Sequence, residues 1–137
     1  DRGFLHSHSY TGNPLACAAA LASLAIFESE PALENNRVTA RIMAELAAPL
    51  AEHPNVADIR QTGMILAIEL VADKATRLPF AAAERRGLRA YRSALANGTV
   101  LRPLGDVLYW MPPYCIDADD LSHLARSTRI AIEEACH

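Results

Sequence analysis

The sequence lacks several features that would fix its class directly. No apolar run is long enough to span a membrane, and no basic leader precedes an apolar segment. A net charge of −3 gives no basic excess for binding nucleic acid or an anionic membrane surface. Small-molecule chemistry or protein contact remains, with the cytoplasm as the expected compartment. The chain also starts at Asp1 without an initiator Met, so we expect that preceding sequence has been lost.

Cysteine and potential metal ligands are sparse. The three cysteines, Cys17, Cys115 and Cys136, are widely spaced and include no Cys-x-x-Cys pair, which predicts reduced, mostly buried thiols. His6 and His8 would share one face of an extended segment, but a third ligand is missing. We therefore predict no metal site.

Local signals predict alternating helices and strands within one domain-sized chain of 137 residues. Asn13 caps a first helix, and Pro14 at its first turn loses no needed hydrogen bond. Glu69, at the end of a strand-like run, is expected to face solvent or form an ion pair. Helices are expected over about 14–29, 31–52 and 80–96 and from 117 onward, with strands within 56–71, bent or interrupted at Gly63, and at 99–102 and 107–111 around a turn at 103–106. This order predicts an α+β fold, in which helices cover a small, largely antiparallel sheet.

The segment His6-Ser7-His8-Ser9-Tyr10-Thr11-Gly12-Asn13-Pro14-Leu15-Ala16-Cys17-Ala18 is a polar loop that runs into a capped helix. Its serine hydroxyls and backbone amides form a donor set that can hold phosphate oxygens. The same residues are also typical of an ordinary polar helix entry. The loop alone leaves both interpretations open.

A second segment, 101–114, places a cation among apolar and aromatic residues. Arg102 lies between Leu101 and Pro103, where a guanidinium is costly unless it meets an anion, and a carboxylate would satisfy it in a bidentate manner. Tyr109 lies across the expected turn and can offer its hydroxyl to the same ligand. Alternatively, Arg102 pairs with a local acid such as Asp106. The aromatic residues of the segment are then all core residues: Tyr109, Trp110 and Tyr114.

Taken together, the two segments resemble the C-terminal part of class III pyridoxal-phosphate-dependent aminotransferases, over essentially the whole chain. The Gly-Asn-Pro-Leu-Ala element at 12–16 is shared widely in that family. The pattern from Arg-Pro-x-Gly at 102–105 to Tyr-x-Met-Pro-Pro-Tyr at 109–114 points to its biotin-pathway members. Those enzymes transfer the amino group of S-adenosylmethionine to 8-amino-7-oxononanoate, giving 7,8-diaminononanoate.

The resemblance implies a fold type I transferase, with residues 1–30 as active-site loop and connecting helix at the large-domain junction and 31–137 as the C-terminal small domain. His8 and Ser9 would contact the phosphate of pyridoxal 5'-phosphate in the partner subunit's active site of a homodimer. Ser7 would contact substrate, Arg102 would hold the substrate carboxylate, and Tyr109 would be the substrate-site aromatic beside Arg102. The family often has Thr where Ser9 stands, a change that keeps the hydroxyl.

The catalytic lysine of such enzymes, which carries the cofactor as a Schiff base, has no candidate here. The single lysine, Lys74, follows a strand in a polar turn and is expected to be a solvated surface residue. The catalytic residues would then lie upstream, and the isolated chain would be inactive. Two alternatives remain open: another class III aminotransferase acting on an ω-amino acid, and a noncatalytic α+β interaction module.

Overall fold

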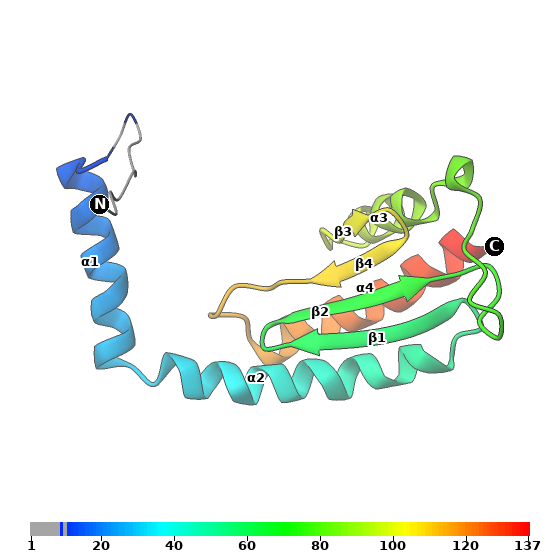
Figure 1. Cartoon of the computed structure of the whole chain (residues 1–137). Coiled ribbons are helices and arrows are strands. Elements are labelled where there is room, and N and C mark those ends of the chain that lie inside the picture. Colours follow the sequence, from blue (N-terminus) through cyan, green and yellow to red (C-terminus); the bar gives the residue numbers. More distant parts are fainter. Residues whose placement is uncertain (1–8, 10) are drawn as a thin grey trace, which may run out of the picture. The chain divides into compact units, whose positions relative to one another are not determined.

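The computed structural model describes Ser9 and residues 11–137, and the chain forms two compact units, Asp1–Glu34 and Asn35–His137. Figure 1 shows the elements along the chain. They are α1 (Pro14–Ser29), α2 (Ala32–Ala47), the 3₁₀ helix η1 (Ala48–Glu52), β1 (Val56–Thr62), β2 (Ile65–Leu70), the 3₁₀ helix η2 (Ala82–Glu84), α3 (Arg86–Ala96), β3 (Arg102–Leu104), β4 (Val107–Trp110) and α4 (Ala118–Cys136). The domain division predicted after residue 30 stays a prediction.

Helix α1 begins as predicted. The Asn13 side chain accepts hydrogen bonds from the backbone N–H groups of Leu15 (3.0 Å) and Ala16 (3.2 Å), which caps the first turn. No residue of α1 is buried within its own unit, where Leu15 and Leu21 are 81% and 67% exposed. Within the described residues, no single helix is both long and apolar enough to cross a membrane; α1 and the α2–η1 segment meet that test only as a bent pair.

The second unit contains a four-stranded antiparallel sheet in the order β1-β2-β4-β3. The predicted α+β class is therefore confirmed, and the run at 56–71 is a hairpin of two strands. Gly63, at φ +55°, provides the left-handed conformation that the hairpin turn needs. Because β3 and β1 are the outer strands, each offers one unpaired backbone edge.

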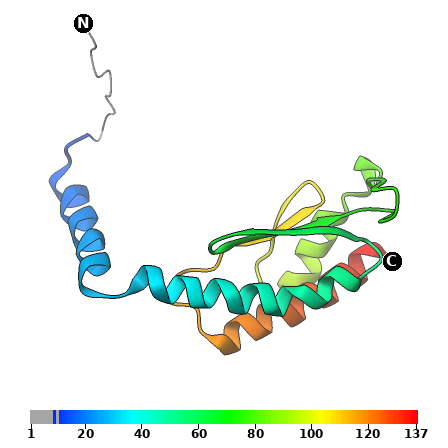
Figure 2. The ribbon, with the colours of Figure 1, turned by 60° about the horizontal axis from the view of Figure 1, so that its bottom comes forward.

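Helices α2, α3 and α4 all lie on one side of this sheet (Figure 2). Strand side chains alternate between the two faces, so every second residue of β2 and β4 meets those helices. The core on this side joins strands and helices: Met43, Ala47, Leu66, Ile68, Ala90, Ala94, Leu101, Leu108, Trp110, Leu121, Ala131 and Ile132 are all buried. The other face carries the alternate residues, and we call it the open face.

A β-bulge between Val56 and Asp58 sets which residues of β1 reach the open face. Val56 pairs with Leu70 and both are buried, whereas Asp58 pairs with Glu69 on the open face. The extra residue reverses the alternation of β1. Asp58 and Glu69 therefore lie on the open face rather than in the core, while β1 still pairs with β2 on both sides of the bulge.

Two predicted boundaries were wrong. The helix expected over 80–96 begins only at Arg86, because Arg85 has a left-handed backbone (φ +50°) that interrupts the helical path. The strand expected at 99–102 is β3, Arg102–Leu104, so Pro103 lies in a strand rather than in the turn. Pro is tolerated there because β3 is an edge strand, where a missing N–H leaves no ladder bond unmade.

Trp110 is held in the core by a short chain of hydrogen bonds. Its Nε1–H donates to the hydroxyl of Thr128 (2.9 Å), which donates to the Leu124 carbonyl (2.7 Å). Trp110 and Thr128 are 1% and 0% exposed, so neither group has water as an alternative partner. The neighbouring hydroxyl of Ser127 is also buried but has no hydrogen-bond partner among the residues that the structure describes.

These adjacent helix residues should respond to substitution in opposite directions. Thr128→Val keeps the shape but leaves the Trp110 N–H unpaired, and we expect it to lower the free energy of unfolding by about 1–3 kcal/mol. Ser127→Ala removes an unpaired buried hydroxyl and should raise it by about 1 kcal/mol. Urea unfolding of both variants tests this, and equal effects of the same sign would contradict the hydrogen-bond assignments.

A second polar arrangement joins the loop before β1 to the end of β2. The His53 Nδ1 accepts a hydrogen bond from the Asn55 N–H (3.1 Å), and the Asn55 side chain donates to the Val71 carbonyl (2.9 Å). Val71 N–H donates back to the Asn55 carbonyl (2.8 Å). An Nδ1 that accepts is unprotonated, so this arrangement needs a neutral ring at His53.

Burial is the main cause that lowers the pKa of His53 below 6.5, and the charges of His137 and Lys74 add to it while Glu133 opposes it. The unfolded chain therefore binds a proton more readily than the folded one between the lowered pKa and 6.5. The stabilisation by His53 is complete above pH 6.5 and is lost as the pH falls below 6.5.

The free energy of unfolding of the wild type should therefore fall more than that of His53→Gln between pH 7.5 and 5, which urea unfolding at each pH measures. NMR titration of the His53 ring should give a pKa under 6.5.

Candidate functional site

Arg102 and Tyr109 form a directly opposed cross-strand pair on the open face. They pair in the register of β3 and β4, so their side chains project from the same face of the sheet. Arg102 is exposed and Tyr109 is half-buried. The turn between the strands has Gly105 at φ +61° in its first central position, as in a type II′ turn. The structure therefore brings these two predicted site residues together.

The same row of the sheet contains a second guanidinium, which is already neutralised. Across the four strands the row reads Arg60, Ala67, Tyr109, Arg102. Arg60 contacts Glu69 at 2.6 Å and Asp58 at 3.0 Å, which confirms the expected ion pair of Glu69. The hydrogen bond to Glu69 is the largest cause that raises the pKa of the Arg60 guanidinium, and the hydrogen bond to Asp58 is the second.

Among the described residues no acidic side chain pairs with Arg102. Asp106, the alternative partner expected from the sequence, instead accepts a hydrogen bond from the Gly87 N–H (2.8 Å) at the start of α3. That alternative is wrong because the helix N-terminus supplies a donor that competes for the carboxylate. Arg102 is consequently available to an anion from outside the described residues.

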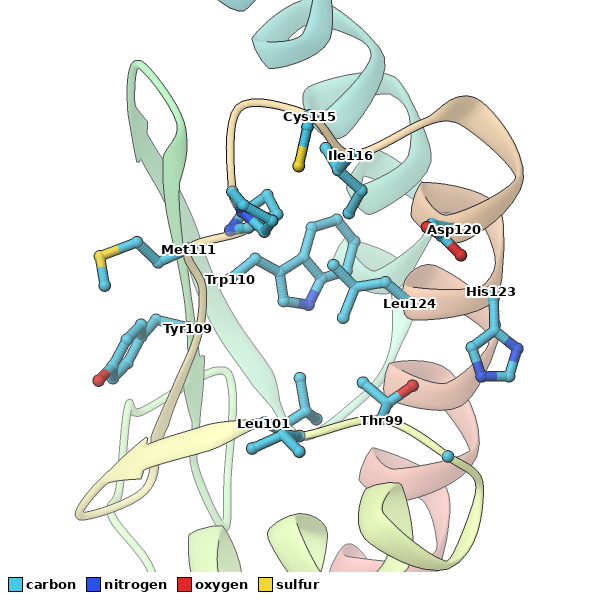
Figure 3. A pocket seen from close by; sticks show the side chains of 14 residues that line it. Thr99, Leu101, Tyr109, Trp110, Met111, Cys115, Ile116, Asp120, His123 and Leu124 are labelled. Atoms are coloured by element: carbon cyan, nitrogen blue, oxygen red, sulfur yellow. The ribbon is translucent and has the colours of Figure 1, made fainter. Parts of the chain in front are cut away.

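The three aromatic residues of this segment lie in different environments. Figure 3 shows Tyr109 and Met111 on one side of β4 and Trp110 on the other. Trp110 is a core residue, as the alternative interpretation held, but Tyr114 is 57% exposed and Tyr109 is on the open face. The alternation of the strand separates adjacent residues in this way.

A hollow of about 390 Å³ lies beside Trp110, between the end of β4 and the first turns of α4. Its rim includes Cys115, Asp120 and His123 (Figure 3). His123 Nε2 lies 3.0 Å from the Asn97 carbonyl, so this ring is already engaged. Of the two residues predicted to meet the substrate carboxylate, Tyr109 lines this hollow and Arg102 does not.

The first predicted segment is only partly described. Ser7 and His8 lie outside the described residues, and Ser9 is exposed in a turn. Because Asn13 already accepts from the Leu15 and Ala16 amides, the helix entry is a capped one, as one interpretation predicted. An exposed hydroxyl at Ser9 fits a phosphate oxygen as a donor. The assignments of Ser7, His8 and Ser9 stay predictions.

Lys74 is an exposed surface residue, as expected, and its amine donates to the Ala51 carbonyl. All three cysteines are free thiols, as predicted, but the prediction that they are mostly buried was wrong, because Cys17 and Cys115 are exposed and Cys136 is only half-buried. Cys17 lies on α1, Cys115 in the loop between β4 and α4, and Cys136 at the end of α4, positions that spacing alone does not reveal. The sequence does not predict the contact of Asp106 with Gly87. The signal for it in the sequence is a glycine at the second position of α3, where a side chain would be expected.

Several solved structures similar to this chain are transaminases. The crystal structure of an adenosylmethionine-8-amino-7-oxononanoate aminotransferase from Methanocaldococcus jannaschii superposes with a TM-score of 0.90 at 37% identity, over 95% of this chain and 30% of that chain. The ω-transaminase from Pseudomonas jessenii in complex with PMP gives 0.88 at 27% identity, over 95% and 29%.

Sequence comparison gives the same class. The aminotransferase class III family matches residues 2–132. The adenosylmethionine-8-amino-7-oxononanoate aminotransferase of Nitratidesulfovibrio vulgaris is 50% identical over 131 residues, which are 96% of this chain and 24% of the relative. The chain belongs to the class III aminotransferases, a family of pyridoxal-phosphate-dependent enzymes, and spans about a quarter to three tenths of the length of these relatives.

The described thiols should differ in reactivity. Burial raises the pKa of the Cys136 thiol to about 11, so about one thiol in a thousand is ionised there at pH 8. Cys115 is exposed, and we expect iodoacetamide to alkylate it at least about tenfold faster than Cys136. Peptide mass spectrometry over a time course measures both sites. Equal rates under native conditions would mean that the end of α4 is open.

Proposed function

We propose that the complete enzyme transfers the amino group of S-adenosylmethionine to 8-amino-7-oxononanoate, giving 7,8-diaminononanoate in biotin biosynthesis. Several relatives at 40–50% identity carry the name of this activity. The observation that carries the proposal is the guanidinium of Arg102, which is exposed beside Tyr109 on the open face and has no acidic partner among the described residues. 8-Amino-7-oxononanoate has a carboxylate that such a group can bind.

In this reaction Arg102 binds the carboxylate through two parallel N–H···O bonds, a geometry that fixes the direction of the substrate as well as its charge. The Tyr109 hydroxyl lies beside that carboxylate and orients it. Arg60 does not compete for the substrate, because Glu69 and Asp58 already neutralise it. One row of the sheet thus offers a single binding cation.

Pyridoxal 5'-phosphate supplies the electron-withdrawing ring that carries the amino group between the two substrates. In this chain His8 and Ser9 would hold its phosphate, with Ser9 donating its hydroxyl. The Leu15 and Ala16 amides of α1 contribute little, because the Asn13 side chain occupies them. The lysine that moves the substrate proton belongs to the part of the enzyme outside this chain.

We also propose that the complete enzyme is a homodimer in which the segment with His8 and Ser9 enters the partner subunit's active site. Helix α1 supports this arrangement, since an apolar helix with no buried residue in its own unit is expected to be covered in the complete assembly. The fragment alone is then inactive.

A second candidate is transamination of an ω-amino acid. The likeness to the ω-transaminase of Pseudomonas jessenii favours it, since that enzyme shares the fold at 27% identity. Single-turnover assays of the full-length enzyme with each amino donor separate the two. Use of S-adenosylmethionine supports the first candidate, and exclusive use of an ω-amino acid supports the second.

Arg102→Ala in the full-length enzyme should lower kcat/KM for 8-amino-7-oxononanoate roughly 10- to 100-fold, because a charged hydrogen-bonding partner of the carboxylate is lost. Arg126→Ala is the matched control: it removes the same charge from an exposed position on α4, away from the open face. Steady-state kinetics measure both. Normal kinetics for the keto acid in Arg102→Ala would refute the assigned role.

A further inference from the structure

The hairpin that carries Arg102 and Tyr109 is joined to α3 at its turn. The Asp106 carboxylate accepts a hydrogen bond from the Gly87 N–H at 2.8 Å. The two backbones also meet closely, since a Cβ at Gly87 would lie 2.0 Å from the Gly105 carbonyl oxygen and 3.0 Å from Pro103 Cβ. Only glycine at position 87 leaves room for the turn in this place.

The start of α3 needs an acceptor from elsewhere in the chain. Arg85, the residue at the N-cap position, has a left-handed backbone and its side chain caps no amide. The Gly87 N–H belongs to the first turn, whose amides lack partners inside the helix. Asp106 supplies the missing acceptor from 19 residues away, and its negative charge lies at the positive end of the helix dipole.

Strand β3 pairs with one strand and packs against the start of α3. It is three residues long, lies at the edge of the sheet and pairs only with β4. The Asp106 carbonyl accepts from the Leu70 N–H (2.9 Å), which ties the β4 side of the turn to β2. The Asp106 carboxylate ties the same turn to α3. One residue therefore sets the placement of the turn relative to both layers.

We propose that Asp106 is a positioning residue for substrate binding. Its bond to Gly87 fixes the β3–β4 turn, and through the short edge strand it fixes the direction in which Arg102 presents its guanidinium beside Tyr109. Without this bond β3 keeps its pairing with β4 and its packing against Gly87, but no side-chain hydrogen bond holds the turn to α3, and the bidentate geometry loosens. This inference rests on the proposed role of Arg102 as the carboxylate-binding residue.

The test uses the full-length holoenzyme and two acceptors, 8-amino-7-oxononanoate and its methyl ester, which lacks the carboxylate. Asp106→Ala should lower kcat/KM for the acid roughly 5- to 10-fold, as expected for a loosened hydrogen-bonded contact, and leave the ester unchanged. Asp106→Asn keeps an acceptor oxygen and should stay within about twofold of the wild type. Asp119→Ala, an exposed position in the first turn of α4, is the matched control.

Arg102→Ala, measured with the same two acceptors, separates the inference from the function on which it rests. If Arg102→Ala loses the acid selectively but Asp106→Ala lowers acid and ester equally, or neither, Asp106 is only structural and the inference is overturned. If Arg102→Ala shows no preference between the acceptors, the carboxylate role fails and the inference fails with it. Should Asp106→Ala not fold, Asp106→Glu, which displaces the carboxylate by one methylene group, carries the same expectation.

Discussion

The arrangement of the second unit depends on the burial of only one face of its sheet. Helices α2, α3 and α4 cover that face, and the strand alternation then assigns every strand residue either to the core or to the open face. Tyr109 and Trp110 are adjacent in β4, so when Tyr109 points to the open face Trp110 points into the core. The bulge at the start of β1 makes the same division work for Val56 and Asp58, which would otherwise share a face. A one-residue slip in pairing would bury Arg102 and expose Trp110.

Hydrogen bonds fix what hydrophobic contact leaves adjustable. Apolar packing is nondirectional, so it holds β4 against the helices without specifying how far the strand can slide or tilt. The bond from Trp110 to Thr128 attaches one end of β4 to α4, and the bond from Gly87 to Asp106 attaches the other end to α3. The strand that carries Tyr109 is thereby fixed at both ends to two different helices. A binding geometry that demands two parallel hydrogen bonds needs this kind of support.

The sequence predicts the local helix caps correctly, but it does not predict the partners that packing brings together from distant parts of the chain. The caps at Asn13 and Asp117 involve amides two or three positions away, so residue type and spacing sufficed. The sequence suggests the nearby Arg102 as a partner of Asp106, but the packing of α3 brings Gly87 to it instead. Pro103 was read as a turn residue, and only the edge position of β3 explains why a strand tolerates it.

The two guanidiniums of the open face show how the same group can serve structure or binding. Arg60 has two carboxylates within 3.0 Å, so its charge is compensated whatever covers this face, and it contributes little to attraction of an anion. Arg102 has no such partner among the described residues, and any surface that removes water from it raises the cost of leaving it unpaired. The same loss of water strengthens its attraction to a carboxylate. A surface that covers the open face would therefore favour the state in which Arg102 binds an anion. The cross-strand pair of Arg102 and Tyr109 lies on that face and can meet such an anion.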